Sequence, residues 1–416
     1  MNEVTDPRRA WLAVIASVFG LVLGPSVILL LCFGIFMPAL HAEFGWPLER
    51  IAFGASIISI VVMFLSPVQG ALVDRFGTRR MVLTFVPVWG VSLLAMSLLP
   101  PSLPIFYLAC AVLPLAALGV WPLSYLRVPT TWFDRRLGIA LGVTSLGPGI
   151  GASLLPLILG LTFAAFGWRY AYVLLGLAVL ALNWPLLALW LRDGSRVSAD
   201  TASSVGGAKS HLGMREVVRS RVFAIMVVQY FILGVASTGL IVNQVAMLVD
   251  VGVSQNMAIY TQSAVGIGSI AGRLITGYLL DRVRAPVIGA LLFGVAAAAS
   301  AILGTSAAAM LAVPLAAAIG FIIGAEFDLL AMLIRRYQGI GAFGRVFGWV
   351  FAAFQLGGSV GVSGLAFIRA HYGSYRPALT ALTLALLLGG ALFALMGRYR
   401  FGPESTGNLL PSTSSK

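Results

Sequence analysis

Three ionisable side chains, Arg273, Glu326 and Asp328, stand inside long apolar stretches of the sequence. A charge within a membrane-crossing helix is costly, so each of the three is a hypothesis for a functional site. A guanidinium binds a carboxylate through two parallel hydrogen bonds, so Arg273 can hold an organic anion. The alternative is a structural ion pair of Arg273 with Asp281 or with an acid of the 308–334 stretch. In both cases, the three residues indicate a place inside the membrane where charged groups bind each other or a solute.

Polar residues at helical spacing indicate the surface that meets such a solute. Ser269, Arg273 and Thr276 recur at spacings of four and three, which places them on one stripe of a helix. Trp121 and Tyr125 form an aromatic pair that can stack on a ligand, although packing between helices or anchoring at the membrane interface is the alternative. The residues expected to contact the solute are Arg273, Gln355, Tyr230, Gln244, Tyr125, Ser269 and Asn243.

Glu326 and Asp328 are two positions apart, which separates them by about 200° around a helix. They are therefore not expected to face one cavity together, and one of them is predicted to be structural. For both we favour gating over substrate binding. Either acid can join Asp281 and Arg282, at the end of the 256–281 stretch, in a lock of charges on the cytoplasmic side.

The residues needed for an enzyme site are missing from the sequence. His41, His211 and His371 are far apart in or near expected loops, and no nucleophile lies beside a base. Cys32 and Cys110 both sit in apolar stretches without metal-binding or redox spacing. We therefore expect no catalytic residue, no metal and no cofactor.

The composition defines the elements that must position these residues. Of 416 residues, 59% are hydrophobic and only 10% are charged, with a mean hydropathy of +0.98, so the chain is predicted to be an all-α membrane protein. The net charge of +13 does not indicate nucleic acid, because the Arg residues stand at the ends of apolar runs. Twelve stretches are long enough to cross a bilayer: 11–38, 50–72, 80–100, 104–127, 137–163, 168–191, 220–249, 256–281, 285–305, 308–334, 343–368 and 374–397.

The distribution of basic residues orients these helices. Of 27 Lys and Arg residues, only Arg50, Arg169, Arg369 and Arg376 fall on the side opposite the termini. The positive-inside rule therefore predicts a multi-pass protein of the inner membrane, with both termini and the 192–219 loop in the cytoplasm. The first stretch is too long for a signal-peptide core, so it is expected to remain as the first helix.

An internal repeat divides the chain into two pseudo-symmetric six-helix halves. The motif Gly70-x-x-x-Asp74-Arg75 recurs as Gly277-x-x-x-Asp281-Arg282, and Phe133, Arg135 and Gly138 match Phe343, Arg345 and Gly348. Such duplication places a binding site between the halves, near the middle of the membrane. The expected domains are a bundle at 1–191, a linker at 192–219, and a second bundle with a short tail at 220–416.

The segment Gly70-Ala-Leu-Val-Asp74-Arg75-Phe-Gly77-Thr-Arg79-Arg80 resembles the loop signature of the major facilitator superfamily. Asp74 can cap a neighbouring helix N-terminus or pair with Arg, and the cluster can hold the cytoplasmic side shut. The residues expected in this charge lock are Asp74, Arg75, Arg79, Asp281, Arg282, Glu326 and Asp328.

Further segments are similar to the monocarboxylate transporter and oxalate:formate antiporter branch of that superfamily. They are Phe33-Gly34-Ile-Phe-Met-Pro-Ala-Leu-His-Ala-Glu43-Phe44-Gly45-Trp46, Trp132-Phe-Asp-Arg135-Arg136-Leu-Gly138-Ile-Ala-Leu-Gly142 and Gly324-Ala-Glu326-Phe-Asp328. The resemblance implies that Arg273 binds the substrate carboxylate. It also implies, for proton-coupled members, an acid one turn before this arginine. Because Ser269 occupies that position, proton symport of the lactate type is not expected.

The favoured function is secondary active transport of a small organic anion, a monocarboxylate or a related aromatic acid, by alternating access. The alternative is an exporter of drug-like or neutral metabolites by proton antiport, which the glycine-rich segment Gly142–Gly151 suggests. The expected partners are a small-molecule solute, with protons or a counter-anion as alternative coupled ions, and the lipid bilayer. A monomer that binds no nucleic acid is expected.

Overall fold

The computed structural model is built of helices and describes residues 7–134, 136–194, 218–253, 255–305, 307–341 and 343–399. Among them, ten helices are long and apolar enough to cross a membrane, and two shorter apolar helices cover Leu103–Ala116 and Ala264–Leu280. The predicted all-α membrane fold is confirmed. Residues 195–217 of the predicted linker, Arg135 and the tail beyond 399 lie outside the described residues.

The first bundle ends at residue 190. Its elements are α1 (Pro7–Val22), the π-helical segment η1 (Ser26–Leu31), α2 (Phe33–Phe44), α3 (Leu48–Phe76), α4 (Thr78–Met96), α5 (Leu103–Ala116), α6 (Pro122–Trp132), α7 (Leu137–Thr144), α8 (Leu146–Phe166), α9 (Trp168–Ala178), the π-helical segment η2 (Val179–Asn183) and α10 (Trp184–Trp190).

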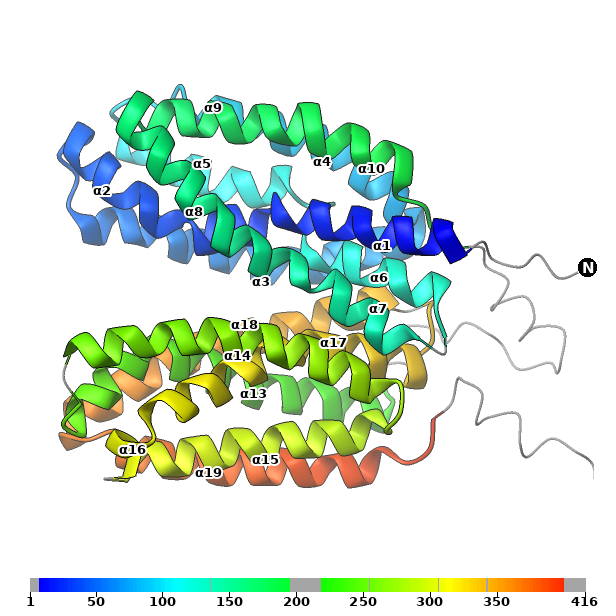
Figure 1. Cartoon of the computed structure of the whole chain (residues 1–416), viewed down its shortest axis with the longest axis vertical. Coiled ribbons are helices and arrows are strands. Elements are labelled where there is room, and N and C mark those ends of the chain that lie inside the picture. The colour runs from blue at the N-terminus through cyan, green and yellow to red at the C-terminus, as the bar shows by residue number, and fades with distance from the viewer. Residues whose placement is uncertain are drawn as a thin grey trace, which may run out of the picture.

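The second bundle lies beside the first, with its long helices running in roughly the same direction (Figure 1). The start of α1 and the end of the last helix lie at the same end of the molecule, here called the terminal end. The elements of the second bundle are α13 (Arg221–Asp250), α14 (Gln255–Leu280), α15 (Ala285–Leu303), α16 (Ala307–Met310), α17 (Ala312–Tyr337), α18 (Phe343–Tyr372), α19 (Arg376–Ala391) and the 3-10 segment η3 (Leu392–Met396).

Several predicted spans are divided among more than one helical element rather than continuous. The 11–38 stretch is divided among α1, η1 and α2, the 104–127 stretch between α5 and α6, and the 137–163 stretch between α7 and α8. Pro122 explains the second interruption, because proline lacks an N–H group and its ring clashes with the preceding turn. The interruption leaves Trp121 in extended conformation at the start of α6.

The two bundles meet along α3 with α18 and along α7 with α14. Glycines permit this close approach. A Cβ atom at Gly70 would lie 1.9 Å from the carbonyl oxygen of Gly344, and one at Gly138 would lie 2.2 Å from that of Gly277. Small residues let helix backbones touch in membranes, so these contacts require glycine.

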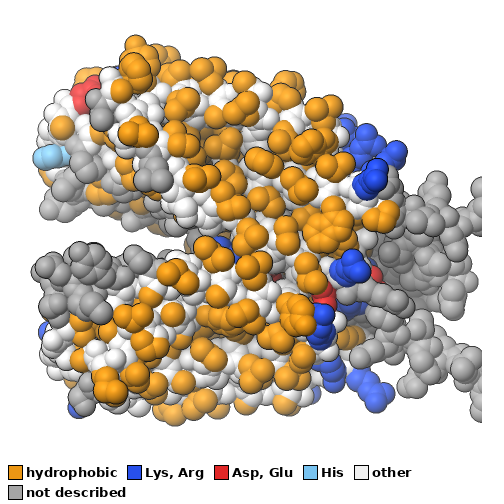
Figure 2. Space-filling view, viewed as in Figure 1, with side chains coloured by type: hydrophobic (Ala, Val, Ile, Leu, Met, Phe, Trp, Pro, Cys, Tyr) orange, Lys and Arg blue, Asp and Glu red, His pale blue; other side chains and the backbone are white. Residues whose placement is uncertain are grey.

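Apolar side chains cover the sides of both bundles, whereas Lys and Arg side chains gather at the terminal end (Figure 2). At the opposite end, the same view shows a cleft that separates the bundles. The protein therefore stands with its bundles in contact at the terminal end and apart at the other end.

Candidate functional site

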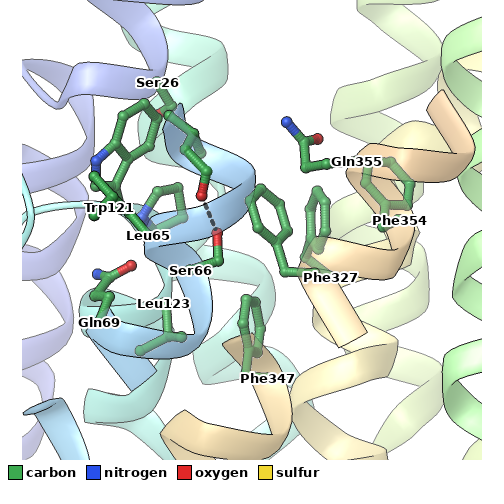
Figure 3. A pocket seen from close by; sticks show the side chains of 13 residues that line it. Ser26, Leu65, Ser66, Gln69, Trp121, Leu123, Phe327, Phe347, Phe354 and Gln355 are labelled. Carbon is green, nitrogen blue, oxygen red and sulfur yellow. Dashed lines mark hydrogen bonds between the residues drawn. The ribbon is translucent and has the colours of Figure 1, made fainter. Parts of the chain in front are cut away.

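A central cavity of about 180 Å³ lies between the bundles. The first bundle contributes η1, one face of α3 and the start of α6, while the second contributes α17 and α18. Figure 3 shows Phe327, Phe347 and Phe354 of the second bundle facing Leu65 and Trp121 of the first. Most of the lining is apolar, as it is in small-molecule sites.

Four phenylalanines form the aromatic wall of this cavity. Phe327 of α17 lies 5.5 Å from Phe351, 5.2 Å from Phe354 and 6.3 Å from Phe347, measured between ring centroids. The three α18 rings follow each other at spacings of four and three residues, so they share one face of that helix. This wall was not predicted from the sequence, although the helical spacing of the phenylalanines was a signal for it.

A few polar groups interrupt the apolar lining. Gln355, predicted to contact the solute, does line the cavity, together with Ser26, Ser66 and Gln69. The Gln69 amide donates to Ser124 Oγ over 3.1 Å, and Ser66 Oγ donates to the Val62 carbonyl over 2.7 Å (Figure 3). Ser26 Oγ is buried and has no hydrogen-bond partner among the described residues. Ser26 begins the π-helical segment, and such segments are frequent at functional sites.

Arg273 lies on α14 against the first bundle, outside the lining of the aromatic cavity. A Cβ atom at Gly149 of α8 would lie 3.1 Å from Arg273 Nη1. Within the described residues the guanidinium makes no ion pair or hydrogen bond, and the acids that act on its charge are Asp328 and Glu326. The alternative partner considered for it, Asp281, instead faces Arg282 and Arg336.

Asp328 and Glu326 are fully buried on α17, and neither lies with Asp281 at the terminal end. Asp328 accepts a hydrogen bond from Ser145, the residue that joins α7 to α8 in the other bundle. Its Oδ2 atom and the Oε2 atom of Glu326 have no hydrogen-bond partner in the described part of the chain. The two acids point to different neighbours, as their separation around the helix predicts, yet both act on Arg273.

The other predicted solute contacts lie within helix packing. Tyr125 is buried against Gly20, where a Cβ atom would come 2.3 Å from its ring, and the Tyr230 hydroxyl donates to the Glu326 carbonyl over 2.6 Å. The amide of Gln244 donates to Thr261 Oγ1, that of Asn243 to the Gly239 carbonyl, and the Ser269 backbone packs against Gly324. None of these five side chains lines the aromatic cavity.

Asp74, predicted to belong to a charge lock, joins the bundles at the terminal end. Its carboxylate accepts hydrogen bonds of 2.8 Å from the backbone N–H groups of Gly344 and Arg345, at the start of α18. The Arg345 and Arg127 side chains approach the same carboxylate to 3.4 and 3.8 Å. Both alternatives considered for Asp74, a helix cap and a pair with arginine, are therefore present together.

Asp281 makes the repeat-related contact from the second bundle. It accepts hydrogen bonds from the backbone N–H groups of Gly138 and Ile139, over 2.6 and 3.0 Å, at the start of α7. Burial raises the pKa of Asp281, and these backbone bonds and the charges of Arg282 and Arg336 offset only part of that rise. Two helix N-termini are thus held by aspartates of the opposite bundle.

The predicted arginines of the lock bind within their own bundles. Arg75 lies over the Phe76 ring, Arg79 donates to the Ala188 carbonyl and Arg282 donates to the Tyr278 carbonyl. A different ion pair crosses the interface, between Arg336 and Asp134, over 2.8 Å. Asp134 belongs to the segment that begins at Trp132, which was interpreted only as a resemblance to the family branch.

Comparisons with known proteins agree with this architecture. The family model of the Major Facilitator Superfamily matches residues 10–362. Monocarboxylate transporter 13 of Rattus norvegicus is 27% identical over 95% of this chain and 90% of its own, and that of Bos taurus is 26% identical over 94% and 91%. In fold, the chain is similar to the fucose:proton symporter FucP of E. coli, with a TM-score of 0.72 at 13% identity, covering 95% of this chain and 99% of FucP. Among the described residues, no three His, Cys, Asp or Glu side chains group as metal ligands. With a family model spanning most of its length and relatives over nearly all of it, this chain belongs to the Major Facilitator Superfamily and is a membrane transporter resembling the monocarboxylate branch.

Proposed function

We propose that this protein is a secondary active transporter that carries a small organic anion across the inner membrane by alternating access. The observation that carries the proposal is Arg273, a guanidinium between the two bundles that makes no ion pair within the described residues. Such a group can bind a carboxylate through two hydrogen bonds, which supports the role of counter-charge.

The charges around Arg273 also determine what must accompany the anion. Arg273 carries one positive charge, whereas Glu326 and Asp328 carry two negative charges when both are ionised. In a buried site of low dielectric constant, this net negative charge repels an arriving carboxylate. A proton bound to either acid removes that repulsion. We therefore propose proton symport, in which the α17 acids carry the proton. They take the place of the acid that the family resemblance implies one turn before Arg273, where this chain has Ser269.

The arrangement of the bundles supports alternating access. The bundles touch at the terminal end and are separated at the opposite end, which corresponds to a conformation open to one side only. In our proposal, the terminal end faces the cytoplasm because Lys and Arg gather there, residues 1–191 and 220–416 move as two bodies, and a single chain suffices.

Uptake by the full-length protein in liposomes tests this proposal. The probes are radiolabelled lactate and benzoate, with an inward proton gradient, and the variant is Arg273→Gln. Losing charge-assisted hydrogen bonds of roughly 1.5–3 kcal/mol lowers uptake about tenfold to hundredfold. The matched control is Arg80→Gln, which removes an exposed arginine outside the proposed site.

Two results would contradict the proposal. Uptake that Arg273→Gln leaves unchanged removes the counter-charge role. Uptake that is indifferent to the proton gradient removes the proposed coupling through α17. If the protein instead drives neutral benzyl alcohol out against its gradient, with no loss in Arg273→Gln, the alternative of a metabolite exporter is supported.

A further inference from the structure

The aromatic cavity points to the class of solute. Resting on the proposed function, we infer that the protein prefers organic acids that carry a planar aromatic ring, and that the cavity between α3, α6, α17 and α18 holds the ring. The anion would lie towards Arg273. Phe327 of the cavity wall stands on α17 between Glu326 and Asp328, the two acids that act on the charge of Arg273. A small hydroxy acid has little apolar surface to fill this cavity.

The walls are suited to a flat ring. Phe351 and Phe354 are within 16° of parallel, and Phe327 meets Phe354 at 70°. Aromatic rings favour offset-stacked and edge-to-face neighbours at such separations, so an additional ring fits both types of contact. On the other side, Trp121 is held by a hydrogen bond of 3.4 Å from its indole N–H to the Pro114 carbonyl. The wall is therefore formed before a solute arrives.

Two polar groups are free to bind a substituent on the ring. Ser26 Oγ is buried and lines the cavity, and no residue that the structure describes makes a hydrogen bond with it. The Gln355 side chain also lines the cavity and makes no side-chain hydrogen bond within the described part of the chain. An unpaired buried hydroxyl is costly, so a ligand that pairs with it gains affinity. A ring hydroxyl or an indole N–H has the required chemistry.

The alternative is that the four phenylalanines only pack α17 against α18. Packing alone would leave them covered, but Phe327 and Phe351 remain partly exposed to the cavity. Packing also does not explain Ser26, which lines the same cavity from the other bundle. Both observations favour a binding surface.

Calorimetric titration of the purified full-length protein tests the inference, with benzoate, 4-hydroxyphenylacetate, indole-3-acetate, lactate and benzyl alcohol as probes. The ring-bearing acids should bind at least tenfold more tightly than lactate. Phe351→Leu keeps apolar bulk in the wall and should remove that preference, whereas the matched control Phe64→Leu, on the exposed face of α3, should preserve it. Ser26→Ala should weaken 4-hydroxyphenylacetate more than benzoate.

The outcomes separate this inference from the proposed function. Lactate binding as tight as benzoate, or a preference that survives Phe351→Leu, overturns the aromatic site while Arg273-dependent uptake of lactate still supports anion transport. Benzyl alcohol binding as tight as benzoate, with Arg273→Gln unchanged, supports the aromatic cavity and contradicts anion transport. Thermal unfolding of each variant identifies any that failed to fold.

Discussion

Asp74 and Asp281 make the same contact in the two repeats, yet their surroundings differ. Each carboxylate accepts two backbone N–H groups at the start of a helix in the opposite bundle. Asp74 also faces Arg127, of which only 11% of the side chain is exposed, whereas the arginines near Asp281 have other partners: Arg336 pairs with Asp134 and Arg282 lies on Tyr278. Duplication thus preserved the helix cap and left the charges to diverge, which makes one contact stronger than the other.

The largest effect is expected from Asp74→Asn. This change leaves Arg127 and Arg345 without their carboxylate, and removing one partner of a buried ion pair costs roughly 3–5 kcal/mol. Both pairs are long, so we expect the ratio of closed to open terminal ends to fall by at least about tenfold. The measurement is the distance distribution between spin labels at Arg80 and Val283, on a background lacking Cys32 and Cys110.

Two further variants check the cause of that effect. Arg127→Gln added to Asp74→Asn should restore much of the closed population, because the uncompensated charge is gone. Asp193→Asn is the matched control, since Asp193 accepts a hydrogen bond from Arg79 within the same bundle. A double variant as open as Asp74→Asn would show that the backbone bonds alone account for the loss.

Asp281→Asn should have a smaller effect. Asparagine keeps one acceptor oxygen, so one of the Gly138 and Ile139 N–H groups loses its partner, at a cost of about 1 kcal/mol. Relief from burying a charge offsets this cost, because the raised pKa of Asp281 means that a neutral side chain is favoured in the closed conformation, and we expect the closed population to change by no more than about threefold. The same spin labels measure it, and a loss equal to that of Asp74→Asn would refute the difference between the two contacts.

The smallest effect is that of pH on Asp281. Burial raises its pKa in the closed conformation, while an opened and hydrated Asp281 returns towards its ordinary pKa of about 3.9. The neutral form therefore favours closure: the stabilisation is full below the ordinary pKa and is lost as pH rises through the closed-state pKa. Acidification towards pH 4 should close the wild type more than Asp281→Asn. The opposite difference between the two would contradict this sign.

The sequence was sufficient for the fold. Repeats and apolar lengths predicted the twelve helices, and Asp74 was expected either to cap a helix or to pair with arginine. The helix that Asp74 caps depends on how the bundles meet, which no local pattern encodes. For the same reason, the contacts that Arg345 and Asp134 make across the interface were not predicted.

The candidate site was harder to predict than the fold. Hydropathy does not distinguish a polar residue that faces a cavity from one that bonds to a neighbouring helix, and Tyr230, Gln244 and Asn243 are of the second kind. Phe351 illustrates the converse, because phenylalanine in a membrane helix is ordinarily assigned to packing. Only the meeting of α17 with α18 shows that it lines a cavity.

The two aspartate caps also make the opening of the terminal end visible in amide hydrogen exchange. The first four N–H groups of a helix have no partner within it, so the amides of Gly138, Ile139, Gly344 and Arg345 are protected only by a carboxylate of the opposite bundle. When the bundles separate, all four amides reach water in the same event. Their deuterium uptake therefore counts the fraction of time spent open, without any label on the protein.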